Sequence, residues 1–575
     1  MEKENKYITI FCVNDGKNHR VPVGGTLQEI SNKYCTCVTD PKTGEKFEVI
    51  AALVDNKLKE LSYKPMIFHQ VEFIGYNHPD GRRTYIRSLC FVLQNAIREL
   101  YPDKVLVIDH SLPSGLYCEI REAVKVENGR RLVYFATDEE LETVRDKMRE
   151  IVRKDLPFIK KKLLSTEAQR IFQANHQPAK AELQISLGTF TCSVYYLDGR
   201  ADTFHGPLIP STRFLKVFEI IGFGNGFCLQ PPSLNNFNKV MPLKRQSKIY
   251  AALKEYSDWC SIIGIDGLGT LNRAIMDGKA INIINLSEAQ HEKRYSEIAE
   301  IIYANRGEKR IVMIAGPSSS GKTTSSLRLT LQCRVLGLKP KVIELDNYFV
   351  NRENTPRDED GNYDFECLEA MDLDFLNQQL NELLEGKEIE IPKFDFKNGC
   401  RTFTGNRLKL QEKDILILEG IHALNPEMTS AVDNARIFRV YASALTSLNI
   451  DENNNMSTSD SRLLRRMVRD NRTRGIVPEE TIVRWNSVRR GENRNIFPFQ
   501  ENADALFNSA LIFEIPLLKY YAEPLLLRIP PNSPAYTEAV RLLKFLNYVI
   551  ALQPSEIAAI PPTSIMREFI GGQTL

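Results

Sequence analysis

The sequence has no excess of charge of one sign, no apolar run long enough to cross a bilayer, and no repeat or low-complexity tract. Its 75 basic and 73 acidic side chains nearly cancel, so no overall field attracts nucleic acid or an anionic membrane, and any polyanion site has to be local. The opening residues are charged and lack the longer apolar core of a signal peptide. We therefore expect a cytoplasmic protein with no membrane partner.

The sequence also has no cysteine framework. Its eleven cysteines are scattered, and Cys35 and Cys37 form the only tight pair. Because no second pair follows at zinc-site spacing, reduced thiols are expected, and neither disulfides nor a structural metal. The polar stretch at residues 451–460 is expected to be a mobile loop. A chain of this length exceeds one ordinary core, so about three or four domains are expected.

Runs of strand and helix periodicity divide the chain into successive parts. The first contains two β-type runs around the turn NDG and then GGT before a helix pattern, which is typical of a β-grasp module. The second is mixed α+β, the third is a mostly helical connector, the fourth alternates strands and helices as in a parallel sheet with crossover helices, and the fifth is a helical tail. The predicted boundaries are 1–75, 80–235, 236–306, 307–525 and 526–575.

A P-loop lies at the start of the fourth part. The stretch GPSSSGKT follows the apolar run RIVMIA and precedes a helix pattern, and this context distinguishes a nucleotide site from a chance match. Lys322 is expected to neutralise the β- and γ-phosphates, and the Thr323 hydroxyl to ligate magnesium. The residues expected to contact the nucleotide are Gly316, Pro317, Ser318, Ser319, Ser320, Gly321, Lys322, Thr323 and Thr324.

Two acidic residues stand where predicted strands end. Asp346 follows the run KVIEL, and Glu419 follows DILIL. Because side chains at the carboxyl ends of parallel strands face the ligand crevice, both carboxylates are expected beside the triphosphate. A carboxylate there can accept a hydroxyl proton or hold magnesium through water. The structural alternative is an aspartate that only caps the next helix.

An arginine-rich helix follows. Arg462, Arg465, Arg466 and Arg469 occupy neighbouring faces of one helical pattern, which is typical of a solvated face or an anion site. In a protein with a P-loop, such a helix is expected to act as a mobile lid. It would close over the triphosphate, exclude water and stabilise charge on the transferring group.

Six motifs occur in the order GPSSSGKTT, LDNYF, NYDFE, IPKFDF, LEGIH and RLLRRMVRD. They give residues 307–520 a specific resemblance to the uridine kinase and phosphoribulokinase family of P-loop kinases. The resemblance implies an α/β fold, ATP with Mg²⁺, and a small-molecule acceptor that is a nucleoside. It implies that Asp346 is the base that takes the acceptor's proton. The implied metal contacts are Thr323, Glu419 and Asp346.

The same resemblance implies further contacts. Asp364 matches the residue that binds the ribose 2′ and 3′ hydroxyls, where one carboxylate can form a bidentate pair. Phe394 stands where the family places an aromatic ring near the base. Arg466, Arg469 and Arg474 match lid arginines at the nucleotide, and Arg469 joins Lys322 and Asp346 as an implied catalytic group.

Two positions depart from the family pattern, and both concern the base. Gly399 stands in place of a histidine that contacts the pyrimidine, and Arg484 in place of a glutamine. The departures leave phosphoryl transfer intact but weaken the case for uridine, because a site that hydrogen-bonds its substrate loses discrimination when those groups change. One alternative is a phosphorylated sugar as acceptor, whose own phosphate Arg484, Arg489, Arg490 and Arg494 would bind.

The front half resembles parts of threonyl-tRNA synthetases. Residues 1–75 are similar to a TGS domain, and residues 80–235 to the second additional (editing) domain. The editing domain's H-x-x-x-H metal pair is replaced by Arg87 and Phe91, and neither can serve as an imidazole ligand. The whole arrangement resembles bacterial proteins labelled nucleoside kinase or uridine kinase-like. It leaves open a nucleotide-gated RNA-binding protein with RNA on the front domains, and an oligomer of unspecified size.

Overall fold

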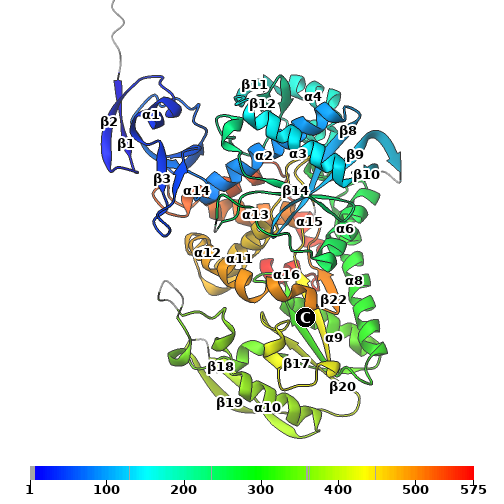
Figure 1. Ribbon diagram of the computed structural model, residues 1–575. Coiled ribbons are helices and arrows are strands. Elements are labelled where there is room, and N and C mark those ends of the chain that lie inside the picture. The colour runs from blue at the N-terminus through cyan, green and yellow to red at the C-terminus, as the bar shows by residue number, and fades with distance from the viewer. Residues whose placement is uncertain are drawn as a thin grey trace, which may run out of the picture.

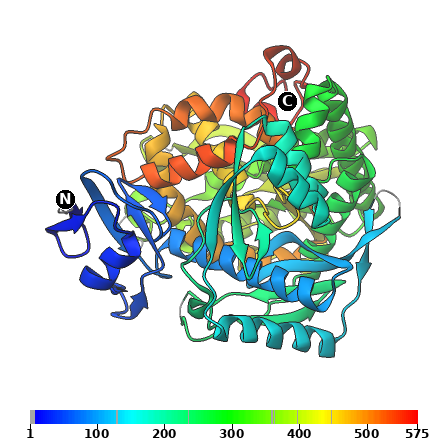
Figure 2. The same ribbon diagram turned by 90° about the horizontal axis from the view of Figure 1, so that it is seen from above.

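The computed structural model describes residues 7–127, 130–234, 236–357, 361, 363–395, 397–446 and 448–575. The chain folds into three units (Figure 1): a β-grasp unit, an α+β unit beside it, and a P-loop unit below them. Seen from above, the β-grasp unit and the helices that precede the P-loop lie on opposite sides of the molecule (Figure 2). The fold classes predicted from the sequence are all present.

The β-grasp unit has a five-stranded sheet, one helix and a separate two-stranded sheet of β3 and β4. The strands of the five-stranded sheet follow the order β2-β1-β7-β5-β6. Helix α1 begins after a capping box in which Thr26 and Glu29 bond each other's backbone N–H, and Asp55 and Asn56 adopt positive φ in the β5–β6 turn. The elements are β1 (Tyr7–Cys12), β2 (Lys17–Pro22), α1 (Leu27–Tyr34), β3 (Cys37–Thr39), β4 (Lys46–Glu48), β5 (Ala51–Val54), β6 (Lys57–Lys59) and β7 (His69–Ile74).

The α+β unit packs two long helices on an antiparallel sheet of order β10-β9-β15-β14, with β8 paired to β9. Helix α3 begins after a capping box formed by Thr137 and Glu140. A smaller sheet, β11-β12-β13, lies beside it. The elements are α2 (Pro79–Leu100), β8 (Lys104–Leu112), β9 (Gly115–Glu127), β10 (Arg130–Tyr134), α3 (Asp138–Arg153), β11 (Ile159–Leu164), α4 (Ser165–Ala174), α5 (Pro178–Leu187), β12 (Thr191–Leu197), β13 (Arg200–Asp202), β14 (Glu219–Phe223) and β15 (Gly226–Gln230).

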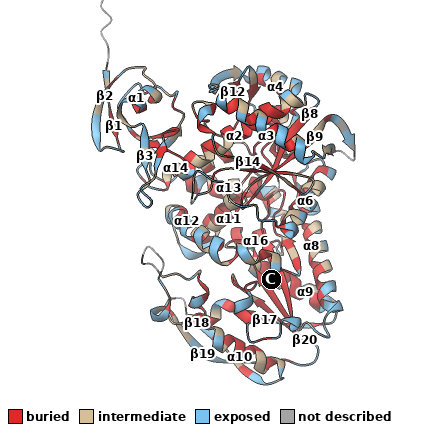
Figure 3. Ribbon diagram, in the orientation of Figure 1, coloured by how far each residue is buried: buried red, intermediate tan, exposed pale blue. Residues whose placement is uncertain are grey.

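The P-loop unit is built on a parallel sheet of order β17-β20-β16-β21-β22. Its three central strands are largely buried (Figure 3). Its strands are β16 (Ile311–Ala315), β17 (Lys339–Glu344), β20 (Asp414–Glu419), β21 (Ile437–Ser443) and β22 (Ala505–Asn508), with the hairpin β18 (Glu388–Asp395) and β19 (Cys400–Lys409). Its helices are α6 (Ser247–Ile262), α7 (Leu268–Met276), α8 (Ala280–Ala304), α9 (Lys322–Val335), α10 (Leu373–Leu384), α11 (Thr458–Arg474), α12 (Pro478–Asn495), α13 (Glu514–Leu526), α14 (Tyr536–Leu546), α15 (Pro554–Ala558) and α16 (Met566–Ile570).

One hydrophobic core joins this sheet to the helices before and after it in the chain. The core runs from Leu183 through α7, α8 and one face of the sheet to Ile570. Helix α8 packs against α9, and α16 packs against α11. The connector and the tail therefore take part in the folding of the P-loop unit, because their apolar faces are buried against it.

The sequence predicts a mobile loop at residues 451–460, and for the first part of this stretch that is wrong. Asp451, Asn453 and Asn454 are at most 7% exposed. Asn453 Oδ1 accepts a 2.7 Å hydrogen bond from Lys180 Nζ, and Glu452 accepts the N–H groups of Ala179 and Lys180 at the start of α5. The polar side chains are held because the α+β unit supplies their partners, which no local pattern reveals.

A cavity of about 880 Å³ lies near this junction. Its lining includes Arg121 from β9, Asp266 ahead of α7, and Glu452. Burial, with the nearby Asp451 charge, raises the pKa of Glu452 to about 7. Residues 316–324 are not among its lining residues, so the cavity is distinct from the P-loop. None of the described helices combines the length and apolarity that crossing a membrane would need.

Candidate active site

The loop between β16 and α9 has the backbone conformation of a phosphate cradle. Gly321 has φ +83° and Ser319 φ +58°, so consecutive peptide units turn away from the strand direction. A Cβ on Gly316 would lie 1.9 Å from Ala442 O of β21, and only glycine fits there. Helix α9 starts directly at Lys322, which adds the positive end of its dipole.

The hydroxyls of this loop fit a phosphate ligand. Within the part of the chain that the structure describes, Ser319 Oγ and Ser320 Oγ are buried and make no hydrogen bond. A buried hydroxyl without a partner costs free energy that a phosphate oxygen would recover. Lys322 Nζ makes a long contact of 3.4 Å, to Pro317 O. Residues 316–324 can therefore hold the phosphates of ATP.

The two strand-end acids converge on the P-loop. Glu344 and Ile314 both pair with Glu419 in the sheet register, so β16, β17 and β20 end level with one another. Thr323 Oγ1 donates a 2.9 Å hydrogen bond to Glu419 Oε1. Asp346 lies in the short helix at residues 345–348 that follows β17. The strand ends thus bring the three oxygen-bearing side chains predicted for the metal to one edge of the sheet.

The electrostatics of this edge favour a bound cation. Desolvation raises the pKa of Glu419 to about 7, with Lys322 acting in the opposite direction. Desolvation also raises the pKa of Asp346. Protein atoms surround this carboxylate closely, although the residue remains accessible to solvent. A divalent cation would offset this cost, and carboxylate and hydroxyl oxygens are the donors that Mg²⁺ takes. The residues present therefore fit magnesium.

Two of the helix α11 arginines are structural. Arg462 and Arg465 are no more than 1% exposed. Arg462 forms a bidentate ion pair with Glu492 of α12, and Arg465 pairs with Glu514 of α13. Arg462 Nη1 also donates to Ser318 O at 3.1 Å. The sequence groups these two arginines with a mobile lid, whereas their buried pairs anchor α11 to the P-loop.

Three further arginines of α11 gather around Asp470, beside the P-loop. Arg466 Nη1 donates a 2.8 Å hydrogen bond to Ser318 Oγ in the P-loop. Arg466, Arg469 and Arg474 all pair with the buried Asp470 at 3.2 to 3.3 Å. The Asp470 carboxylate thus holds three guanidinium groups beside the cradle, in a position where they can bind a polyanion.

The predicted substrate residues are only partly brought together. The backbone N–H of Phe394 in β18 bonds Asn347 Oδ1 at 3.1 Å, which fixes Phe394 beside the Asp346 turn. Asp364 Oδ1 accepts the N–H of Glu366 at 3.0 Å. Arg484 is exposed on α12, and no described contact joins it to the other site residues.

Sequence reasoning missed three acids at the site. Glu492 Oε1 accepts the Ser318 N–H at 3.0 Å, and burial together with Glu492 raises the pKa of Glu366 to about 7. Glu568 contacts Thr324 in the first turn of α9. Glu366 ends the NYDFE motif, which predicted a role for Asp364 alone. Glu492 and Glu568 lie in none of the six motifs, and they reach the P-loop from α12 and α16.

In the α+β unit, Arg87 and Phe91 stand where the resemblance to the editing domain places two metal-ligating histidines. Arg87 donates through Nε and Nη2 to Pro207 O at 3.2 and 3.1 Å. Phe91 is fully buried and packs on Phe204, with ring centroids 5.1 Å apart. A Cβ on Gly206 would lie 2.6 Å from Arg87 Cζ. The positions of the two histidines are thus filled by a guanidinium and a ring.

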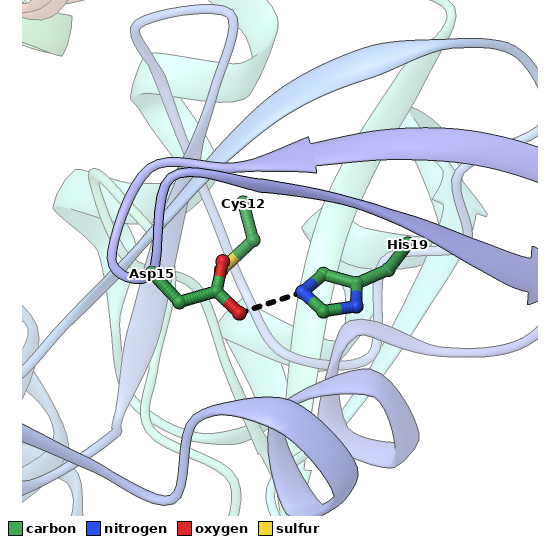
Figure 4. Close-up of side chains that lie close together, drawn as sticks. All are labelled: Cys12, Asp15 and His19. Carbon is green, nitrogen blue, oxygen red and sulfur yellow. Dashed lines mark hydrogen bonds and ion pairs between the residues drawn. The ribbon is translucent and has the colours of Figure 1, made fainter.

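Three side chains of zinc-ligand type meet in the β-grasp unit. The ligand atoms of Cys12, Asp15 and His19 lie within 4.8 Å of one another (Figure 4). Asp15 Oδ2 is 2.7 Å from His19 Nε2, and Oδ1 accepts the Lys17 N–H at 3.0 Å. Both carboxylate oxygens are therefore used to close the β1–β2 hairpin.

Comparison with known proteins finds a family for the region that contains this site. The family model "Phosphoribulokinase / Uridine kinase family" matches residues 311–514. A uridine kinase of Macrococcus caseolyticus is 30% identical over 197 residues, which cover 34% of this chain and 86% of that enzyme. The chain belongs to the phosphoribulokinase/uridine kinase family. A uridine kinase of Halobacterium salinarum is 28% identical over 194 residues, 34% of this chain and 77% of that enzyme.

The front region of this family member is similar to a different class of protein. The threonine–tRNA ligase of Rubrobacter xylanophilus is 28% identical over 206 residues, 36% of this chain. The chain spans only 29% of that ligase's length. Among solved structures, one described as a possible uridine kinase from Bacillus stearothermophilus aligns with a TM-score of 0.26 and 19% identity, over 37% of this chain and 97% of that one.

Proposed function

We propose that the protein is an ATP- and magnesium-dependent kinase that phosphorylates the 5′-hydroxyl of a nucleoside. The observation that carries the proposal is the hydrogen bond from Thr323 to Glu419, with Asp346 and Lys322 at the same sheet edge. It joins the phosphate cradle to one carboxylate and Asp346 stands nearby as a second, and positioning plus electrostatic stabilisation is what phosphoryl transfer requires.

The side chains of the site divide the chemistry between them. Asp346 accepts the proton of the attacking 5′-hydroxyl, whose oxygen forms a bond to the γ-phosphorus while the bond to the β-phosphate oxygen breaks. Lys322 and Arg469 neutralise charge on the transferring group and on the departing ADP. Thr323 and Glu419 would hold magnesium, which neutralises the donor phosphates. The products are a nucleoside monophosphate, ADP and a proton.

The proposed acceptor rests on Asp364 and Phe394. A carboxylate opposite two adjacent hydroxyls binds ribose through both oxygens. The backbone N–H of Phe394 bonds Asn347 beside the Asp346 turn, and its buried ring packs on Phe349. Purified protein with ATP, Mg²⁺ and a panel of nucleosides is expected to yield ADP and one or more monophosphates. A panel that also contains sugar phosphates distinguishes a nucleoside acceptor from the phosphorylated sugar of a phosphoribulokinase-like reaction. Intact ATP binding with no product from any nucleoside would refute the nucleoside proposal.

The similarity to threonine–tRNA ligases supports a second proposal, RNA contact through the front units. Strand β11 exposes Lys161 and Lys162 at the edge of its sheet, where they can meet phosphates. Salt-dependent tRNA binding that Lys161→Glu weakens and Lys322→Ala leaves unchanged is the expected result. Binding that is independent of salt would argue against a phosphate contact.

A further inference from the structure

Residues 564–573, here called the closing segment, cover one side of the P-loop. A Cβ on Gly321 would lie 2.2 Å from Ile565 Cδ1, so the Ile565 side chain rests directly on the loop. Ser564, Met566 and Phe569 are fully buried. The segment reaches the P-loop from far along the chain, and its packing is as tight as that of a core element.

The closing segment uses both hydrogen-bonding capacities of the Thr324 hydroxyl. Thr324 Oγ1 donates to Glu568 Oε2 at 2.7 Å and accepts from Gln573 Nε2 at 2.9 Å. Thr324 is fully buried. The second oxygen, Glu568 Oε1, lies 3.7 Å from Arg469 Nη1. A carboxylate thus lies between a P-loop hydroxyl and an arginine, which are both groups that can bind an anionic ligand.

The direction of Thr324 identifies which part of the donor it faces. Thr323 points to Glu419, the metal side of the cradle. Successive helical residues are about 100° apart, so Thr324 points to another side. A P-loop cradles the α- and β-phosphates with its backbone while its lysine reaches the β- and γ-phosphates. The α-phosphate and the nucleoside of a bound donor would therefore lie on the side that Thr324 faces.

We propose that the closing segment is the nucleoside-side wall of the donor site, and that Glu568 holds the Thr324 hydroxyl until the donor's α-phosphate replaces it. This inference rests on the proposed function. Glu568 is the positioning group: in the free protein its carboxylate accepts the Thr324 hydrogen bond and lies beside the Arg469 guanidinium. When the α-phosphate of the donor binds, a phosphate oxygen replaces Glu568 as the acceptor of the Thr324 hydrogen bond. Glu568 then remains paired with Arg469.

The backbone of the segment is anchored independently of this carboxylate. Arg472 donates to Glu568 O at 2.9 Å and to Phe569 O at 3.0 Å. The Arg465 guanidinium lies 5.1 Å from the centroid of the Phe569 ring. Because these contacts involve the main chain and a neighbouring ring, the Glu568 side chain can turn without release of the segment. Substitution of Glu568 should therefore change donor affinity without unfolding the wall.

The test is equilibrium binding of ATP, ADP and adenosine to the full chain, without acceptor, by calorimetry. Glu568→Gln is expected to tighten ATP and ADP about fivefold, because a negative charge next to the phosphate is removed, and to leave adenosine unchanged. Glu568→Ala is the second variant, and thermal melting verifies that both fold. The matched control is Glu556→Gln in α15, where the Glu556 carboxylate caps the Gln553 N–H at 2.7 Å and glutamine can do the same.

The outcomes separate this inference from the proposed function. If either Glu568 variant folds and binds ATP no more tightly than the wild type and Glu556→Gln, the displaced-carboxylate inference is overturned. Lys322→Ala verifies in the same assay that binding occurs at the P-loop. If ATP binds but no acceptor is phosphorylated, the proposed kinase activity fails while the Glu568 comparison still decides this inference.

Discussion

Arg462 and Glu492 form a buried bidentate ion pair between α11 and α12, directly beneath the P-loop. Glu492 also accepts the N–H of Ser318, so one carboxylate ties two helices to the phosphate cradle. Such a pair carries a large desolvation cost, and its value lies in holding the loop's geometry.

Loss of either partner should therefore be severe. Glu492→Ala leaves the Arg462 charge buried and unpaired, and we expect a loss of about 3–5 kcal/mol in the free energy of unfolding. Urea denaturation measures it. Arg407 and Glu388 form an exposed pair on the β18–β19 hairpin, and Glu388→Ala as control should cost less than about 1 kcal/mol. Equal losses in both variants would contradict the anchoring role.

Asp346 is proposed as the general base. Asp346→Asn should lower kcat by roughly 10²–10⁴-fold and leave the KM for ATP nearly unchanged, because the amide keeps the shape of the side chain but cannot accept the hydroxyl proton. Chromatography of ADP and monophosphate measures the rate. Asp374→Asn, an exposed change at the start of α10, is the control. A kcat within twofold of the wild type would remove Asp346 from this role.

Asp364 is proposed to bind the ribose hydroxyls. If it does, 2′-deoxynucleosides should be used with a kcat/KM lower by about 10–100-fold, because one half of the bidentate contact is lost. Asp364→Asn should reduce the ratio of kcat/KM between ribonucleosides and 2′-deoxynucleosides and leave the affinity for ATP unchanged. Competition between a ribonucleoside and its deoxy form measures the ratio. A wild-type protein indifferent to the 2′-hydroxyl would argue for another acceptor.

His291 should make the fold acid-sensitive. Burial lowers its pKa to about 3, and its Nε2 bonds Ala510 O at 3.1 Å. The unfolded chain then binds a proton that the folded chain does not, so stability is complete above about pH 6.5 and is lost as pH falls toward 3, by roughly 1.4 kcal/mol per pH unit. Urea unfolding at several pH values should show a shallower loss for His291→Gln. The exposed His176→Asn should follow the wild type.

Asn453 should bind the P-loop unit to the α+β unit. Its Oδ1 accepts from Lys180, Gln94 and Gln177. In Asn453→Ala, Lys180 and Gln177 keep Asp202 as a partner, whereas the buried Gln94 amide loses its bond, so the variant should cost about 1–3 kcal/mol. The neighbouring Asn455 bonds Ser111 Oγ at an exposed site, and Asn455→Ala should change stability by less than about 0.5 kcal/mol. Thermal melting with limited proteolysis of the junction distinguishes the two variants.

Much of the site was predictable because its signals are local. The P-loop spacing, the apolar run before it and the helix after it lie within about twenty neighbouring residues, and the acids at Asp346 and Glu419 follow strands that parallel pairing aligns. The capping boxes at Thr26 and Thr137 are equally local. The base-side residues were harder to predict: Arg484 lies on an exposed helix face, and only the register of α12 against its neighbours decides which face that is.

The amino-acid sequence alone determined the phosphate cradle, the strand-end carboxylates and the order of the units, since each depends on residues close together in the chain. Only the tertiary structure decided that Glu492 supports Ser318, that Lys180 meets Asn453, and that Glu568 bonds Thr324. These pairs are 174, 273 and 244 residues apart. Contacts at such separations arise when whole elements pack together, and they leave no period or spacing in the sequence.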